Sequence, residues 1–340
     1  MIRIISVFFF LAIVNCAFSQ TRYDSIKSLS AKITLGIKDE RKKLDAILYW
    51  VTDNIEYDVV SYKKSLRGQK IYPDFGIRQM DSIAREKEYD EAIACMTVYL
   101  KKAVCEGYAR LFKSLCIHSG IQCVVVSGKA KTLLSDQLAG HAWNAVKLDG
   151  KWQLVDPTWA SGYVNGDSFT KERNLFYYLT SPEIMFINHL PNEQKWTLLD
   201  KSFNSLTFGQ SPIEDVSVIE KGLVDYSPKK RGLKIKKGQL ITISLQFNKP
   251  PSKFNIGISE SGRPETRASR LNIELTDKVY DSLNNIDPDY FKTIEKIQIL
   301  SQKIIGNKVE FVIKPLSEIK GINIHIDYGF TALSYDIVYL

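Results

Sequence analysis

Three residues of this chain have the types and the order that acyl transfer through a thioester requires. Cys105 lies in the segment Ala-Val-Cys-Glu-Gly-Tyr, His141 in Gly-His-Ala-Trp-Asn, and Asp156 in Leu-Val-Asp-Pro-Thr-Trp. A cysteine supplies the nucleophile, a histidine the base, and an aspartate the group that orients the base. These three side chains are therefore the candidate catalytic residues.

A β-hairpin is predicted to position two of them. The dipeptide Asp149-Gly150 separates the strand-like runs 141–148 and 151–156, and a two-residue Asp-Gly loop is typical of a type I′ turn. Counting back from this loop puts His141 and Asp156 on one face as diagonal neighbours, roughly 7 to 8 Å apart at the backbone. The carboxylate can then reach the imidazole.

A helix is predicted to begin at or near Cys105. Apolar side chains recur at helical spacing from Tyr108 to Cys116, and Ser119-Gly120 ends the pattern. The free N–H groups and the dipole at a helix start favour a negative charge, and hence a thiolate over a thiol. We expect this helix to pack on the sheet face that carries His141, which would bring the three side chains together.

Each of these residues alone also has a structural interpretation, as a buried thiol, a hydrogen-bonded strand histidine or a turn aspartate. Their combination with the hairpin register favours the catalytic interpretation. A metal site is not predicted, because the candidate ligands lack the close Cys-x-x-Cys or His-x-x-x-His pairs typical of zinc sites. No cofactor is predicted either.

These segments resemble the transglutaminase-like superfamily of papain-related cysteine enzymes, in particular its bacterial and kyphoscoliosis-peptidase-like branch. Motif blocks occur in family order at 49–58, 104–109, 141–144 and 151–159, and the resemblance covers roughly residues 40 to 200. It implies an α+β fold with a papain-like transglutaminase core, in which helices pack on an antiparallel sheet.

The resemblance also implies a role for each catalytic candidate. Cys105 is the nucleophile, His141 the general base and then the general acid, and Asp156 the residue that orients His141. The neighbouring motif residues that we expect to line a substrate cleft are Trp143, Asn144 and Trp159. The backbone N–H of Cys105 is the natural hydrogen-bond donor to the oxyanion. The sequence does not assign the second donor.

The polar segment 61–88 is longer than the connection expected in this family. It either shapes the substrate cleft or is an ordinary surface insertion, and we favour the insertion. No acidic cluster with calcium-loop spacing is found, so the calcium activation of animal transglutaminases is not carried over.

The organisation of the chain changes near residue 205. Before it, helical patterns accompany the hairpin; after it come short alternating runs such as 240–245 and 309–313, separated by turn signals. We predict a signal peptide at 1–19, a catalytic domain at 20–204, and an all-β, sandwich-like accessory domain at 205–340.

The first residues are typical of a secretory signal peptide. A positive start at Arg3 precedes the apolar run 4–14, and Ala17-Phe18-Ser19 fits a cleavage site after Ser19. The run is shorter than the roughly 20 residues of a membrane span. We expect a secreted, periplasmic or cell-envelope protein with no transmembrane segment, and lipoprotein processing at Cys16 is the alternative.

The formal net charge of +8 over 340 residues is a mild excess and does not indicate nucleic-acid binding. The densest basic cluster, residues 229–237, is predicted to be solvated. Attraction of this cluster to anionic cell-surface polymers is the alternative.

The predicted reaction is attack of Cys105 on an amide carbonyl of a protein or peptide. Resolution of the thioester by water would make the chain a cysteine protease or amidase. Resolution by a lysine amine would make it a cross-linking protein-glutamine acyltransferase. We favour hydrolysis, because an exported enzyme meets abundant water. A catalytically silent binding or scaffold protein at the cell surface is the alternative, and the oligomeric state stays open.

Overall fold

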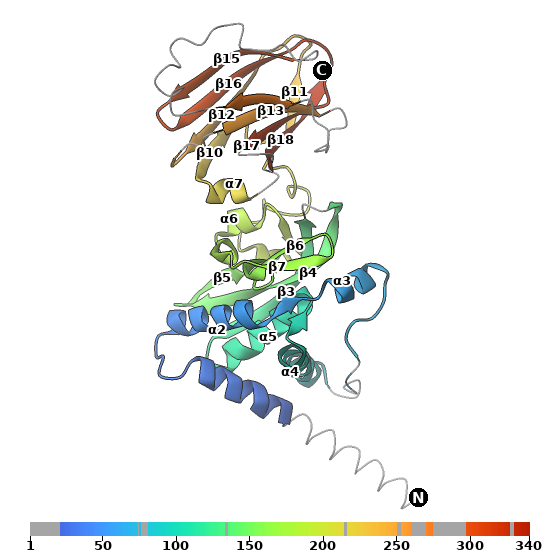
Figure 1. Cartoon of the computed structure of the whole chain (residues 1–340), viewed down its shortest axis with the longest axis vertical. Helices are drawn as coiled ribbons and strands as arrows, with labels where there is room; N and C mark the ends of the chain where they lie inside the picture. The colour runs from blue at the N-terminus through green and yellow to red at the C-terminus, as the bar shows by residue number, and fades with distance from the viewer. Residues whose placement is uncertain are drawn as a thin grey trace, which may run out of the picture. The chain divides into compact units, whose positions relative to one another are not determined.

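The protein has two compact units, Met1–Phe203 and Asn204–Leu340, in a computed structural model (Figure 1). The structure describes residues 21–73, 75, 81–132, 135–213, 216–249, 253–259, 270–274, 297–326 and 330–340. The predicted signal peptide and the alternative lipoprotein cysteine, Cys16, lie outside the described residues. The division predicted from the sequence lies between residues 204 and 205.

The first unit combines helices with a five-stranded antiparallel sheet of order β8-β5-β4-β3-β9. Residues 21–33 are helical. The elements that follow are α2 (Glu40–Asn54), β1 (Glu56–Tyr57), α3 (Val59–Leu66), α4 (Ser82–Leu100), β2 (Lys102–Ala103), α5 (Cys105–His118), β3 (Gln122–Thr132), β4 (Ser135–Leu148), β5 (Lys151–Val155), η1 (Trp159–Ser161), β6 (Gly162–Asn165), β7 (Ser168–Lys171), η2 (Leu175–Tyr177), β8 (Tyr178–Thr180), α6 (Pro182–Met185), β9 (His189–Pro191) and η3 (Gln194–Thr197). This arrangement confirms the predicted α+β fold of helices on an antiparallel sheet.

The hairpin of β4 and β5 has the predicted register. Asp149 and Gly150 have φ values of 49° and 77°, as a type I′ turn requires at both central residues. Leu148 pairs with Lys151, and the ladder continues without a shift to the pair of Asn144 and Val155. The prediction that rested on the Asp-Gly loop is confirmed.

Both faces of this sheet are covered by packed side chains. One face carries Val146 and Leu148, which share a buried core with α2 and α5. The other carries Trp143 and Ala145, which belong to a separate cluster with α6. His141 belongs to the second set by strand alternation, so α5 packs on the face opposite to the one predicted. The prediction was wrong because both faces of β4 are apolar, and alternation alone does not say which face a helix covers.

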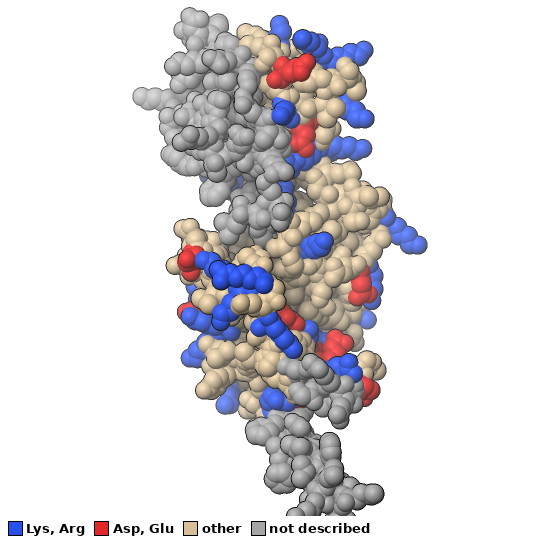
Figure 2. Space-filling view, turned by 90° about the vertical axis from the view of Figure 1, so that its right-hand side faces the viewer, with Lys and Arg blue, Asp and Glu red and all other residues tan. Residues whose placement is uncertain are grey.

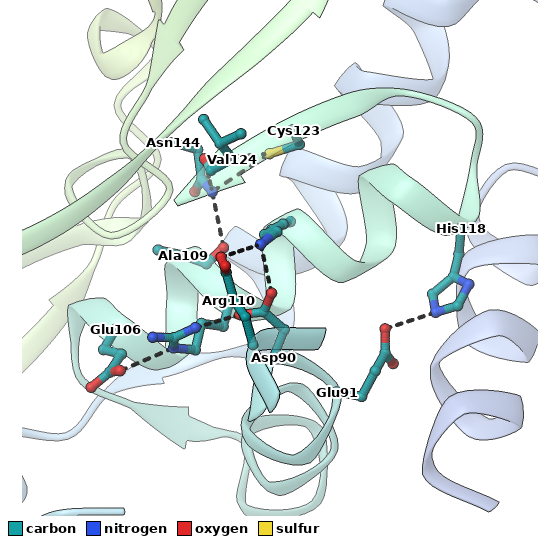
Figure 3. A network of polar contacts seen from close by, with 11 residues as sticks. Asp90, Glu91, Glu106, Ala109, Arg110, His118, Cys123, Val124 and Asn144 are labelled. Atoms are coloured by element: carbon teal, nitrogen blue, oxygen red, sulfur yellow. Dashed lines mark hydrogen bonds and ion pairs between the residues drawn. The ribbon is translucent and has the colours of Figure 1, made fainter. Parts of the chain in front are cut away.

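Charged side chains buried between α4 and α5 fix the helix that begins at Cys105 (Figure 3). Arg110 donates a hydrogen bond to Asp90, whose other oxygen lies 2.6 Å from the Lys113 ammonium. Further along α5, His118 Nε2 lies 3.0 Å from Glu91. Both carboxylates are buried, and removing one partner of a buried ion pair typically costs about 3 to 5 kcal/mol. The two helices are therefore held together by more than apolar contact.

The second unit is rich in strands, as predicted. It contains one sheet of order β10-β12-β16-β15 and another of order β11-β18-β17-β13-β14. In the first sheet, alternate residues of β12 and β16 are buried, which is the pattern of a sheet with one face in a core. The elements are α7 (Ser217–Glu220), β10 (Leu223–Ser227), β11 (Gly232–Ile235), β12 (Ile241–Phe247), β13 (Lys253–Ser259), β14 (Arg270–Glu274), β15 (Ile297–Ile305), β16 (Lys308–Pro315), β17 (Gly321–Ile326) and β18 (Phe330–Tyr339).

Charged side chains on the face shown in Figure 2 are mixed in sign. In Figure 2, Lys and Arg side chains are spread over the visible face with Asp and Glu between them, and they do not line one continuous basic groove. Among the residues that the structure describes, no helix is long and apolar enough to cross a membrane.

Candidate active site

Cys105 is the first residue of α5 and is half-buried. The preceding N-cap residue, Val104, has an apolar side chain, which makes no capping hydrogen bond to the helix. The first N–H groups of a helix have no partner within the helix, and its dipole favours a negative charge at this end. The start of α5 therefore suits both a thiolate and the oxyanion of an acyl-transfer intermediate.

Close packing around Gly107 holds the start of α5 in place. A Cβ atom at this position would lie 2.5 Å from Ala103 Cβ and 2.5 Å from the Tyr72 hydroxyl oxygen. Ala103 in turn pairs with Tyr57 through the parallel β1–β2 bridge. The glycine two residues after Cys105 is needed because β2 and the Tyr72 segment approach the helix backbone at this point.

His141 and Asp156 form a direct hydrogen bond of 2.7 Å between Nε2 and Oδ2. The other carboxylate oxygen, Oδ1, accepts hydrogen bonds from the backbone N–H groups of Thr158 at 2.8 Å and Trp159 at 3.1 Å. Because Nε2 faces Asp156, Nδ1 is the ring nitrogen left for Cys105, with whose side chain His141 also has a hydrogen-bonding interaction. The structure thus brings the three predicted catalytic residues together.

The electrostatics of this group favour a charged imidazole. Burial lowers the pKa of His141, but the Asp156 carboxylate and the Cys105 side chain outweigh it and raise this pKa to about 10. Burial also opposes ionisation of Asp156, yet the charge of His141 and hydrogen bonds from His141 and His189 hold its pKa well below the usual range. An imidazolium beside the sulfur is the setting in which a thiolate is stabilised.

His189 is a fourth member of this group that the sequence analysis did not single out. Its Nε2 lies 3.0 Å from Asp156 Oδ2, the same oxygen that contacts His141, and its Nδ1 lies 2.6 Å from the side-chain oxygen of Asn188. The side chain is fully buried, and burial lowers its pKa. His189 comes from β9, whose pairing with β3 brings it to the site. No local motif around residue 189 indicates this contact.

Side chains of the types of His141, Asp156 and His189 can bind metal ions, and their ligand atoms here all lie within 4.8 Å of one another. The two N–O distances of 2.7 and 3.0 Å are those of hydrogen bonds. Ligands bound to tetrahedral zinc at about 2.0 to 2.1 Å would lie about 3.3 Å apart. The observed arrangement is therefore a hydrogen-bonded network.

The predicted cleft residues lie in two different environments. Trp159 is half-buried, and its ring centroid lies 5.3 Å from that of His141. Trp143 is only 1% exposed and Asn144 is fully buried. The Asn144 amide donates to the carbonyl oxygen of Ala109 at 2.9 Å (Figure 3). Contrary to the sequence-based assignment, Trp143 and Asn144 are interior residues that cannot contact a substrate from these positions.

Tyrosine side chains lie on the Cys105 side of the site. Burial, followed by the charge of Cys105, raises the pKa of both Tyr57 and Tyr62. The ring of Tyr57 lies 5.9 Å from that of Tyr62 and 6.3 Å from that of Phe169 in β7. Tyr62 belongs to the segment 61–88, for which we favoured a plain surface insertion. The structure places α3 close enough to Cys105 for the two side chains to interact electrostatically, and the choice between cleft and surface insertion stays a prediction.

Comparison with known proteins supports a family relationship for the first unit. Residues 27–157 match the model of the transglutaminase-like superfamily. The chain is 29% identical over 245 residues to Kyphoscoliosis peptidase of Mus musculus, covering 69% of this chain and 33% of that protein. For Kyphoscoliosis peptidase of Homo sapiens the identity is 29% over 244 residues, with the same coverage. The chain thus spans about a third of the length of these relatives.

One solved structure, of a TGase, aligns with a TM-score of 0.28 at 19% identity, over 46% of this chain and 35% of that one. A score this low carries no inference about the site.

Proposed function

We propose that this chain, in which residues 27–157 form a transglutaminase-like domain, is a cysteine-dependent acyl-transfer enzyme acting on amide bonds of proteins or peptides. The observation that carries the proposal is the buried hydrogen bond between His141 Nε2 and Asp156. This bond leaves Nδ1 of His141 to interact with Cys105. Cys105 itself lies at the start of α5, where no side chain caps the helix.

The reaction begins when the Cys105 thiolate attacks the carbonyl carbon of the amide. The carbonyl oxygen takes the electron pair, and the backbone N–H of Cys105 is the donor available to that oxyanion. His141 then passes its Nδ1 proton to the leaving nitrogen, the C–N bond breaks, and a thioester and a free amine remain. At this stage the imidazole is neutral.

Resolution of the thioester reverses the proton transfer. His141 Nδ1 accepts a proton from water as the water oxygen attacks the thioester carbon, and the thiolate leaves as a carboxylic acid forms. A lysine amine in place of water would give an isopeptide cross-link. We propose hydrolysis as the main outcome, because water is abundant outside the cell and because two of the relatives that match this chain are named Kyphoscoliosis peptidase.

Export is part of the same proposal. The signal-peptide pattern at residues 1–19 supports it, and we propose that the enzyme acts in the periplasm, at the cell surface or outside the cell.

The test combines a peptide library with a primary-amine probe and detects products by mass spectrometry. We expect cleaved or deamidated peptides from the wild-type protein and none from Cys105→Ala, with Cys95→Ala as a control because Cys95 is another free, half-buried thiol. Dominant incorporation of the amine would overturn the preference for hydrolysis. Absence of any product, together with iodoacetamide alkylation of Cys105 no faster than that of an ordinary thiol at pH 7, would favour a binding protein.

A further inference from the structure

His189 has no part in the reaction steps above, although it contacts the carboxylate on which His141 depends. Its side chain is fully buried, and its ring lies against the edges and faces of two tryptophans. The centroid distances are 4.5 Å to Trp159 and 5.0 Å to Trp143. A histidine this enclosed cannot receive substrate or water from outside, so its function must act through the groups that it touches.

Its contact with Asp156 has a defined proton arrangement. An ionised carboxylate oxygen can only accept hydrogen bonds. Oδ2 lies 2.7 Å from His141 Nε2 and 3.0 Å from His189 Nε2, so both nitrogens carry protons. His189 therefore donates to the same oxygen as His141, whatever the protonation of its other nitrogen.

Counting donors shows why this contact matters. Asp156 is fully buried, and a carboxylate has about four acceptor sites. Two backbone N–H groups occupy Oδ1 and two imidazoles occupy Oδ2. Without His189, one of these sites would lack a donor in an interior that water does not reach. Hydrogen bonds to the charged form of a carboxyl group favour that form, so losing one would favour transfer of the His141 proton to Asp156.

We propose that His189 is a positioning residue whose Nε2–H bond to Asp156 Oδ2 keeps this buried carboxylate ionised and so keeps the proton on His141. The role rests on the proposed function of Cys105, His141 and Asp156. It does not require His189 to touch substrate.

Two substitutions separate the hydrogen bond from the packing. His189→Phe keeps an aromatic ring between the tryptophans but removes the donor, whereas His189→Gln keeps an N–H donor close to the position of Nε2. We expect His189→Phe to lower kcat roughly 10- to 100-fold, the size of a hydrogen bond to a charged group, with KM changed less than threefold. His189→Gln should recover most of this loss.

A second measurement needs no substrate. The rate of Cys105 alkylation by iodoacetamide is followed from pH 4 to 10 in the wild type and in both variants. The titratable groups that contact Asp156 are His141 and His189, Tyr57 also senses the charge of Asp156, and Cys105 interacts with the other side of the His141 ring. In His189→Phe we expect the acidic limb of the profile to move to higher pH, so that alkylation on that limb slows about tenfold, while His189→Gln follows the wild type.

Two results would overturn the proposal. One is a folded His189→Phe protein with wild-type kcat and a wild-type alkylation profile; the other is equal impairment of both variants with an unchanged profile, which would indicate packing alone. If His189→Phe does not fold, ¹⁵N NMR of the wild-type imidazoles decides, because a His189 Nε2 without a bound proton contradicts the assignment. A wild-type protein without turnover would instead refute the proposed function, and the alkylation and NMR measurements would still test His189.

Discussion

Replacing Asp156 by asparagine keeps the shape of the side chain but exchanges one carboxylate oxygen for an NH₂ group, which affects the hydrogen bonds with both His141 and His189. The amide oxygen can still accept from the N–H groups of Thr158 and Trp159, which now contact Oδ1. The amide nitrogen takes the place of Oδ2 and is a donor, so it faces two imidazole nitrogens that are donors in the wild type. His141 can relieve this conflict only by giving up the proton on Nε2, which leaves a neutral imidazole with its proton on Nδ1. In that tautomer no free nitrogen faces Cys105, so His141 cannot take the thiol proton and form the thiolate–imidazolium pair with which the proposed reaction begins.

The size of the effect follows from the pKa of His141. This pKa is about 10, against 6.5 for an ordinary histidine. Burial lowers it, and the Asp156 carboxylate makes the main contribution that raises it. At about 1.4 kcal/mol per pH unit, losing this difference costs the imidazolium about 5 kcal/mol, or a factor of roughly 10³ to 10⁴ in the ratio of imidazolium to imidazole. The corresponding substitution in a serine-protease triad lowers kcat by about 10⁴ for the same tautomeric reason. We expect Asp156→Asn to lower kcat by about 10³ to 10⁴ with little change in KM.

The assay measures kcat and KM on a peptide identified with the library, together with circular dichroism to verify folding. Asp200→Asn is the matched control, because Asp200 is an exposed carboxylate whose hydrogen bonds are to Ser202. Alkylation of Cys105 at pH 6 should slow sharply in Asp156→Asn and stay unchanged in the control. A folded Asp156→Asn protein that retains kcat within tenfold of the wild type would refute the conclusion that Asp156 holds the proton on His141.

Three further outcomes are expected. A Cβ at Gly128 would lie 2.3 Å from the carbonyl oxygen of Leu190, so Gly128→Ala should lower the free energy of unfolding by about 3 kcal/mol in urea titrations. Gly140→Ala, in the paired strand and with open space around the new methyl, should change it by less than about 0.5 kcal/mol. Gly107→Ala should cost about 1 to 3 kcal/mol and slow Cys105 alkylation, because the helix start must shift; an unchanged rate would contradict this. Thermal stability should fall between pH 7 and 10, because stabilisation by His141 is full below pH 6.5 and is lost as pH rises towards its pKa of about 10; His141→Gln should flatten this fall, and an equal slope would exclude His141 as the cause.

The local parts of the site could be predicted from the sequence. The Asp149-Gly150 loop determines the hairpin register, because both residues accept positive φ and a two-residue loop allows no other pairing of the strands that it joins. From that register the contact between His141 and Asp156 follows directly. The helical spacing after Cys105 likewise predicted a helix that begins at the nucleophile.

The parts that depend on long-range packing could not be predicted. His189 is 33 residues from Asp156 in the chain and reaches it only because β9 pairs with β3. The burial of Trp143 and Asn144 depends on which elements cover each face of β4, and this strand is apolar on both faces. A motif shows which residues occur near a site in sequence, but burial decides which of them a substrate can reach.

The hydrogen bond from Asn144 to the carbonyl of Ala109 limits how far His141 and Cys105 can move apart. It joins β4, three residues after the base, to α5, one helical turn after the nucleophile. The strand that carries His141 and the helix that carries Cys105 are thus joined by a buried hydrogen bond, and separating them would break it. Outside this pair of elements, α3 and the β6–β7 hairpin place the rings of Tyr62 and Phe169 at 5.9 Å and 6.3 Å from that of Tyr57.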